Sequence, residues 1–159
     1  MADTPIAFEP HDHSACAGDV LARAAAECDR SGFRMTPVRR RTLEILLESH
    51  RALGAYEVLE RLSADGFGHQ PPVAYRALEF LVAHGFAHKV RRLNAFAACM
   101  HPDEPHSPAF FICRECDAVA EAPVAEVHAA LARAAGNLGF MLERANLEAV
   151  GLCPTCSAT

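Results

Sequence analysis

Two Cys-x-x-Cys pairs are the residues of this sequence best suited to chemistry. Cys113 and Cys116 form the first pair, and Cys153 and Cys156 form the second. Two residues between the cysteines let both sulfurs of a pair turn toward one point about 2.3 Å away, which is the bond length of tetrahedral zinc. A redox-active dithiol needs only one such pair, placed at a helix N-terminus. The spacing therefore predicts one structural zinc held by all four cysteines.

A second group of metal-ligating side chains surrounds a proline-rich segment. It consists of His88, Cys99, His106 and Glu121. One thiolate, one carboxylate and two neutral imidazoles offset the charge of Zn²⁺, and thiolate with imidazole favours zinc over iron or manganese. Each residue also has an ordinary explanation, as a strand histidine, a core cysteine, a linker histidine or a surface charge. Spacing alone leaves both interpretations open.

Other histidines and cysteines are further candidates for metal binding. His101 follows Cys99 by two residues and is the alternative to His106. The rest are His11, His13 and Cys16 near the N-terminus and His128 on an expected helix. We expect the N-terminal three not to bind metal, because they fall in a segment that we interpret as a flexible tail.

The overall composition excludes several classes of protein. The seven cysteines are an odd number, which does not suit a disulfide framework. The N-terminal residues lack the basic start and apolar stretch of a secretory signal. No apolar run reaches the roughly 18 to 20 residues of a membrane helix. We therefore expect a cytoplasmic protein that does not contact a membrane.

The elements that must position these groups follow from apolar periodicity and turn residues. Helices followed by a β-hairpin are typical of a winged-helix domain, which we assign to residues 18–99 after a flexible tail over 1–17. We expect helices over about 19–30, from 37 onward, over 55–64 and over 73–84, with hairpin strands over 86–90 and 95–99. The stripe expected to face the core in the last helix is Ala74, Leu78, Leu81 and Val82.

A second, smaller domain follows a break in composition. Residues 100–108 contain three prolines and are expected to form a hinge. Residues 109–159 predict a small α/β domain whose elements are strands over 109–113 and 118–121, a helix over 124–138 with Val127, Leu131 and Leu138 facing inward, and a half-buried strand over 140–150. About fifty residues rarely bury enough apolar surface alone, so this domain needs a metal or a partner subunit. The predicted fold class is α+β.

Charge is divided unevenly along the chain. Residues 30–92 hold eleven basic and six acidic residues and so carry +5, whereas the whole chain carries −5 and the remainder therefore −10. A basic module joined to an acidic one is typical of a DNA-binding domain linked to another domain. A stretch of +5 is also common on an ordinary solvated surface, so this signal is weak alone.

Several stretches resemble the ferric uptake regulator family, and most closely its zinc uptake regulator branch. They are RMTPVR at 34–39, AYEVLERL at 55–62, PPVAYRAL at 71–78, ALEFLVAHGFAHKV at 77–90, FFIC at 110–113 and LEAVGLCPTC at 147–156. The likeness covers about residues 20–156 in order. The family's iron-responsive members carry a His-His-x-His cluster before the first Cys-x-x-Cys pair, and this sequence lacks it.

The resemblance implies a homodimeric winged-helix repressor that binds an operator in double-stranded DNA, with a C-terminal dimerisation domain and two Zn²⁺ ions per subunit. The four cysteines of the two Cys-x-x-Cys pairs, which we call the knuckles, would hold the structural ion. His88, Cys99, His106 and Glu121 would hold the regulatory ion. The family's DNA contacts fall on Tyr75, Arg76, Tyr56 and Arg39. This sequence departs from the family in having Val73-Ala74 where Thr-Val usually precedes the Tyr-Arg pair, which removes one hydroxyl that could hold a phosphate.

Three alternatives differ from a zinc-responsive repressor. A relative sensing iron, manganese, nickel or peroxide would share the fold, and a zinc storage or delivery protein would form no sequence-selective DNA complex. A hydrolytic zinc enzyme needs an open metal position, and four protein ligands leave none. We therefore expect no enzymatic activity and no small-molecule substrate.

Overall fold

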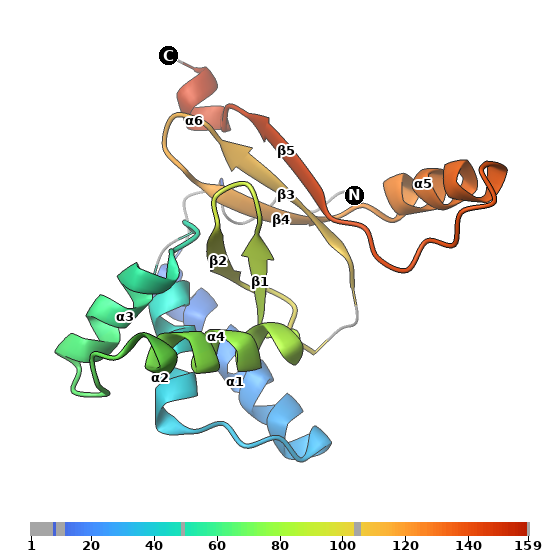
Figure 1. The fold of residues 1–159 in the computed structure, drawn as a ribbon. Helices are drawn as coiled ribbons and strands as arrows, with labels where there is room; N and C mark the ends of the chain where they lie inside the picture. Colours follow the sequence, from blue (N-terminus) through green and yellow to red (C-terminus); the bar gives the residue numbers. More distant parts are fainter. Residues whose placement is uncertain (1–7, 9–11, 49, 104–105, 159) are drawn as a thin grey trace.

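A computed structural model describes residues 8, 12–48, 50–103 and 106–158. Four helices come first, followed by a hairpin and then a mixed sheet with two more helices (Figure 1). The elements are α1 (His13–Ser31), α2 (Pro37–Leu47), α3 (Ala55–Ala64), α4 (Pro71–Ala83), β1 (Ala87–Val90), β2 (Ala95–Ala98), β3 (Pro108–Cys113), β4 (Val119–Pro123), α5 (Ala125–Asn137), β5 (Leu147–Gly151) and α6 (Pro154–Ser157). The expected α+β class is confirmed.

Helix α1 begins six residues earlier than the sequence predicted, so residues 13–17 are helical and not part of a flexible tail. The reason is an N-cap, because the Asp12 carboxylate accepts hydrogen bonds from the backbone N–H groups of Ser14 and Ala15 at 2.9 and 3.4 Å. His11 and most of the remaining tail lie outside the described residues. At the other end Gly32, with φ +74°, closes the helix.

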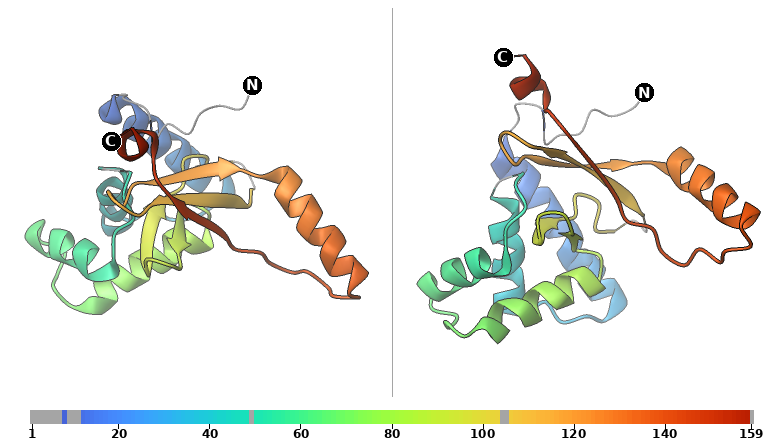
Figure 2. Two further views of the ribbon diagram at one scale, coloured as in Figure 1. Left: turned by 90° about the horizontal axis from the view of Figure 1, so that it is seen from above. Right: turned by 45° about the horizontal axis from the view of Figure 1, so that its top comes forward.

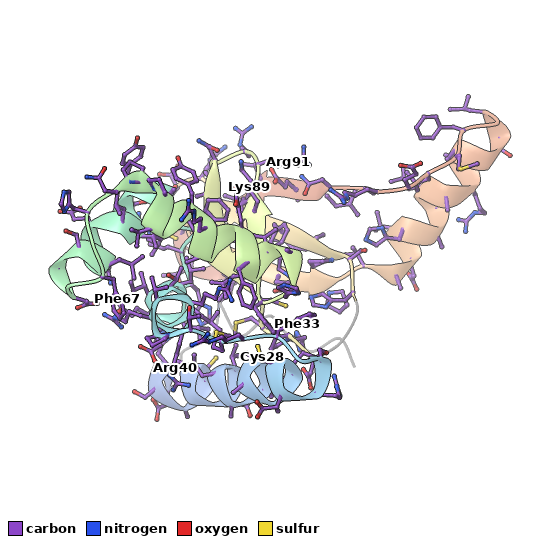
Figure 3. All side chains as sticks on the ribbon, turned by 60° about the horizontal axis from the view of Figure 1, so that its bottom comes forward. Cys28, Phe33, Arg40, Phe67, Lys89 and Arg91 are labelled. Atoms are coloured by element: carbon purple, nitrogen blue, oxygen red, sulfur yellow. The ribbon has the colours of Figure 1, made fainter. Side chains whose placement is uncertain are left out.

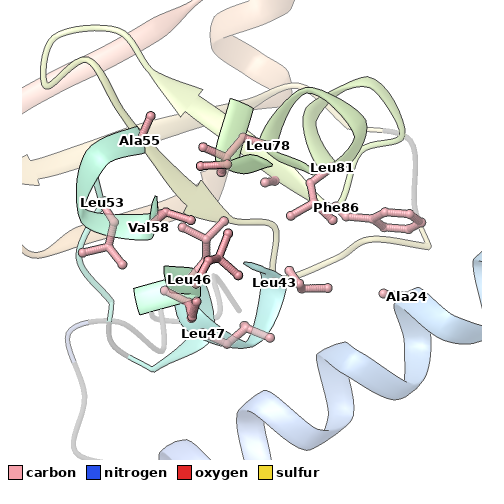
Figure 4. Packing of buried hydrophobic residues seen from close by; sticks show 14 of the residues in the cluster. Ala24, Leu43, Leu46, Leu47, Leu53, Ala55, Val58, Leu78, Leu81 and Phe86 are labelled. Atoms are coloured by element: carbon pink, nitrogen blue, oxygen red, sulfur yellow. The ribbon is translucent and has the colours of Figure 1, made fainter. Parts of the chain in front are cut away.

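Helices α1 to α4 enclose one hydrophobic core, in which Leu43, Leu46, Val58, Leu78 and Phe86 are fully buried (Figure 4). Thr36 caps α2 and Pro37 occupies its first turn, where the sequence predicted that a helix begins. The expectation for Val82 was wrong. Val82 is 37% exposed and Ala77 is buried instead, because the buried stripe follows the spacing i, i+3, i+4, i+7 from Ala74 to Leu81 and leaves Val82 at its edge.

The hairpin pairs β1 with β2 in antiparallel register and lies between the helices and the C-terminal sheet (Figures 1 and 2). Its turn, Arg91 to Asn94, places Asn94 at φ +46°, a conformation that asparagine tolerates well. Leu53 and Phe96 exchange two backbone hydrogen bonds of 2.8 Å, which ties β2 to the segment before α3. Backbone hydrogen bonds thus join the hairpin to the helical part, and apolar side chains of the hairpin pack against the sheet.

The C-terminal sheet has the order β4-β3-β5, with β4 antiparallel and β5 parallel to β3. β3 begins at Pro108, a residue that the sequence assigned to the hinge. The half-buried strand expected over 140–150 forms only as β5, and Phe140 and Met141 are 63% and 82% exposed. Among the described residues, 140–146 have no neighbouring strand to supply the hydrogen bonds that a strand needs.

Helix α5 projects from the end of the sheet, away from α1 to α4 (Figures 1 and 2). Its predicted inward residues are exposed, with Val127 at 49%, Leu131 at 36% and Leu138 at 83%. The amphipathic pattern therefore predicted the helix correctly. The expectation that its apolar side chains pack inside the same chain was wrong. None of the described helices is long and apolar enough to cross a membrane.

Candidate metal centres and nucleic-acid surface

The two Cys-x-x-Cys pairs meet because β3 and β5 are parallel neighbours. Cys113 ends β3 and pairs with Gly151 of β5, so the knuckle after each strand lies at the same edge of the sheet. All four sulfurs lie within 4.8 Å of one another. The sulfurs of Cys116 and Cys153 are 3.8 Å apart, which matches the edge of about 3.8 Å expected for a tetrahedron with zinc–sulfur bonds of about 2.3 Å.

Backbone N–H groups prepare two of these sulfurs for a cation. The N–H of Cys153 donates to the Cys113 sulfur at 3.4 Å, and the N–H of Cys156 donates to the Cys153 sulfur at 3.4 Å. Donors of this kind, led by the N–H of Cys153, lower the pKa of Cys113 to about 6. Hydrogen bonding to Cys153 and burial raise the pKa of Cys156 to about 12. The cluster therefore holds a thiolate beside thiols that a metal must deprotonate.

The second group joins the hairpin, the linker and the sheet. His88 lies on β1, Cys99 follows β2, His106 lies in the linker and Glu121 lies on β4, and their ligand atoms are all within 4.8 Å of one another. The Cys99 sulfur is 3.4 Å from His106 Nε2 and 3.8 Å from Glu121 Oε1. Tetrahedral zinc with mixed ligands has edges of about 3.3 to 3.8 Å. The imidazole of His106 also contacts Glu121 Oε1 directly.

One polar atom of this group is left without a hydrogen bond inside the protein. Nε2 of His88 is buried, lies 3.5 Å from Glu121 Oε1 and has no hydrogen-bond partner among the described residues. A buried nitrogen lone pair without a donor is costly unless another species occupies its direction. A zinc ion at the centre of the four atoms would satisfy it, so the donor set fits the metal.

Burial and neighbouring groups shift the pKa values of Cys99 and Glu121 in opposite directions. Burial raises the pKa of Cys99 far above the usual thiol value, and the carboxylate of Glu121 adds to this effect. Burial also acts to raise the pKa of Glu121, but the nearby imidazole of His88 and the backbone N–H of Met100, which donates to Glu121 at 3.2 Å, outweigh it and leave the pKa below its ordinary value. The site thus presents the carboxylate of Glu121 and the thiol of Cys99, whose proton a bound metal must displace.

The linker that carries His106 is attached to the first helix, a contact that the sequence gave no sign of. Arg23 of α1 donates to Asp103 Oδ1 at 2.9 Å and to the carbonyl oxygen of Met100 at 3.3 Å. A pocket of about 340 Å³ beside these residues is lined by His88 and His106. The two imidazoles of the second group therefore border this pocket.

The other metal-binding candidates lie outside the two centres. The ring of His101 lies edge-on to that of His106, with centroids 6.1 Å apart, but its nitrogens do not belong to the four-atom group. His128 on α5 contacts the carbonyl oxygen of Ser107 at 2.6 Å. His13 lies on α1 beside the ring of His50, with centroids 4.9 Å apart, and Cys16 lies on the same helix.

Three of the residues predicted to contact DNA are exposed to solvent. Tyr56 on α3 is 68% exposed and Tyr75 on α4 is 42% exposed, and Arg76 beside it is also exposed. Lys89 and Arg91 extend from the hairpin (Figure 3). Arg39 is held more tightly than the sequence suggested, because its guanidinium stacks 3.7 Å from the ring of Phe80 and donates to the carbonyl oxygen of Arg34 at 2.6 Å.

Comparison with known proteins gives a consistent family assignment. A model described as the ferric uptake regulator family matches residues 30–150. The zinc uptake regulation protein of Escherichia coli (strain K12) is 37% identical over 139 residues, which cover 87% of this chain and 81% of that protein. The solved structure of a zinc uptake regulator complexed with zinc and DNA is 36% identical and superposes with a TM-score of 0.85, covering 89% of this chain and 95% of that one.

Two solved forms of a further protein differ in their likeness to this chain. Holo XcZur is 37% identical and gives a TM-score of 0.81, covering 90% of this chain and 99% of its own. Apo XcZur is 35% identical over 89% of this chain and 97% of its own, but gives a TM-score of only 0.51. Because identity and coverage are almost the same, the difference lies in how the parts of the chain are arranged.

Proposed function

The chain belongs to the ferric uptake regulator family, and from that premise we propose that it is a zinc-responsive repressor that binds operator DNA and controls genes of zinc uptake. The observation that carries the proposal is the convergence of four ligand atoms from three parts of the chain. His88 belongs to the winged-helix part, His106 to the linker and Glu121 to the sheet. Such a centre links metal occupancy to the angle between the two parts.

Two ions per subunit have different tasks in this proposal. The knuckle site, formed by Cys113, Cys116, Cys153 and Cys156, closes the end of the C-terminal domain onto its first strand and contributes to folding. The hinge site, formed by His88, Cys99, His106 and Glu121, responds to the zinc concentration. Both sites offer four protein ligands and leave no open position for substrate, which supports a regulator and not an enzyme.

The apolar surface of α5 and the segment after it supports a homodimer. Val127, Leu131, Leu138, Phe140 and Met141 are exposed in the single chain. Several large apolar side chains left exposed along one helix and the segment after it are unusual on a soluble monomer and typical of an interface. In a dimer, the angle that each hinge site fixes sets the separation of two recognition helices, which must match half-sites about one helical turn apart or a multiple of it.

Helix α4 is the proposed recognition helix, with Arg76 as the residue that reads bases. Tyr75 and Tyr56 flank it, and Arg39 supports it from beneath through its contact with Phe80. The similarity of the chain to holo XcZur, and its lower similarity to apo XcZur, supports a link between metal and arrangement. A preference of about 1.4 kcal/mol for the competent arrangement changes its population about tenfold.

The proposal is tested with double-stranded DNA selected from a random library by the zinc-loaded protein. Binding is measured by fluorescence anisotropy at buffered zinc concentrations, and again with iron(II) and manganese(II). We expect wild-type protein to bind tightly only above a threshold of zinc, and His88→Ala and Cys99→Ser to bind weakly at every concentration while remaining dimers. His101→Ala and Cys16→Ser are the matched controls and should behave as wild type. Unchanged zinc dependence in both site variants would contradict the sensor assignment.

A further inference from the structure

A second carboxylate of the sheet contacts the hairpin at its turn. Glu148 of β5 accepts hydrogen bonds from two successive backbone N–H groups, that of Arg91 at 2.6 Å on one oxygen and that of Arg92 at 3.0 Å on the other. The side-chain amide of Asn146 donates to the first oxygen at 3.0 Å. These residues are more than fifty positions apart in the sequence, so the contact is tertiary and joins the two parts of the molecule.

The position of Glu148 follows from strand register. Phe110 of β3 pairs with Glu121 on β4 and with Glu148 on β5, so the three residues form one row across the sheet. Neighbours in such a row point to the same face. This face meets the hairpin. Glu121 reaches the base of the hairpin at His88 and Met100, and Glu148 reaches its turn.

Apolar packing between the two carboxylates holds the hairpin against the same row. Val90, the last residue of β1, is fully buried and packs in one cluster with Phe110, Ile112 and Val119 of the sheet. The hairpin is therefore attached at two ends with an apolar contact between them. One attachment uses metal ligands, and the other uses backbone N–H groups that need no metal.

We propose that Glu148 is a positioning residue that holds the β1–β2 hairpin against the C-terminal sheet and thereby orients Lys89, Arg91 and Arg92 toward DNA. Its two oxygens match two parallel N–H donors, and hydrogen bonds to an ionised acceptor are stronger than neutral ones. The DNA part of this inference rests on the proposed function. The contact itself, and its link to the hinge site, do not depend on the proposed function.

The contact and the hinge metal favour the same arrangement of hairpin and sheet. Two interactions that favour one arrangement must strengthen each other, because the coupling free energy is reciprocal. Loss of the Glu148 contact therefore weakens zinc at the hinge site although no ligand is altered. The knuckle site, which lies beyond the other end of β5, is unaffected.

The test compares Glu148→Ala and Glu148→Gln with Glu143→Ala. Glu143 is exposed and makes no hydrogen bond among the described residues. Its substitution by alanine therefore removes the same charge from the same part of the chain without breaking a contact. In zinc-loaded full-length protein, we expect amide hydrogen exchange of Arg91 and Arg92, followed by NMR, to rise roughly tenfold or more in Glu148→Ala. Glu148→Gln keeps one acceptor oxygen, so only one amide should be strongly affected. Hinge zinc affinity, measured by chelator competition, should fall several-fold in Glu148→Ala and stay unchanged in Glu143→Ala.

The DNA measurement separates this inference from the proposed function. At saturating zinc, Glu148→Ala should bind the selected DNA several-fold more weakly, with the dimer mass and knuckle zinc content of wild type. Unchanged exchange of both amides, or raised exchange with unchanged zinc and DNA affinity, would overturn the positioning role. If wild-type protein bound no DNA at all, the proposed function would fail, while exchange and zinc affinity would still decide the role of Glu148. If Glu148→Ala did not fold, the same readings would be taken on Glu148→Gln.

Discussion

At the scale of single residues, the four knuckle cysteines differ in how they titrate. Cys113 has a pKa of about 6 because backbone N–H groups stabilise its thiolate. Cys156 has a pKa of about 12 because neighbouring thiols and burial favour its neutral form. Near neutral pH, zinc therefore meets one sulfur that is already ionised and displaces a proton from another.

We predict that the pH dependence of zinc affinity at the knuckle site changes slope near pH 6. Affinity should rise with pH throughout, because zinc and protons compete for the sulfurs. Below the pKa of Cys113 one more proton must be displaced, so the slope of log affinity against pH steepens by about one. Chelator competition in Cys99→Ser, which removes the hinge thiolate, measures it. A constant slope through pH 6 would contradict the assigned pKa of Cys113.

A second prediction at this scale separates base reading from phosphate binding. Arg76→Ala should lose about 1 to 3 kcal/mol of discrimination at one base pair of the selected DNA and bind random DNA almost as before. Lys89→Ala should weaken both DNAs alike and reduce the salt dependence by about one ion. Affinity titrations at several salt concentrations give both quantities. If Arg76→Ala weakened both DNAs equally, Arg76 would be a phosphate contact.

At the scale of elements, helix α5 presents its apolar face to solvent in the single chain. We predict that Leu131→Glu converts the dimer to a monomer, because it places a charge in the middle of the surface that a second chain must cover. Arg133→Glu changes an exposed residue of the same helix and should leave the dimer intact. Sedimentation velocity of both zinc-loaded variants measures the mass. A Leu131→Glu dimer of wild-type stability would place the interface elsewhere.

The elements also show what the sequence could predict. Helices α2, α3 and α4, the hairpin and the meeting of the two knuckles followed from local signals such as Thr36-Pro37 and the Cys-x-x-Cys spacing. Apolar periodicity identified α5 but could not say what covers it, so Leu131 was wrongly placed in a core. The contacts of Arg23 with Asp103 and of Glu148 with the hairpin turn join distant segments and leave no local pattern. For the hinge group, spacing left two interpretations open, and the family resemblance favoured one.

At the scale of the whole molecule, the angle between the winged-helix part and the sheet depends on the hinge site in our proposal. We predict that removing hinge zinc alone, with a chelator too weak to strip the knuckle, increases the radius of gyration of the dimer, because the hairpin loses one of its two attachments to the sheet. Small-angle X-ray scattering before and after readdition of zinc measures this. Cys99→Ser should show the expanded form with and without zinc. Identical scattering of the loaded and stripped dimer would refute a metal-set angle.

The parallel pairing of β5 with β3 has a consequence for how the protein is made. The core of α1 to α4 and the hairpin uses residues 20–87 and is complete early in synthesis. The last strand of the sheet and two of the four knuckle sulfurs emerge from the ribosome much later. A chain that stops before Leu147 thus contains the winged-helix part but lacks β5, two of the four knuckle sulfurs and the Glu148 contact. Loading of the knuckle metal with all four ligands therefore requires that the chain has been synthesised through Cys156.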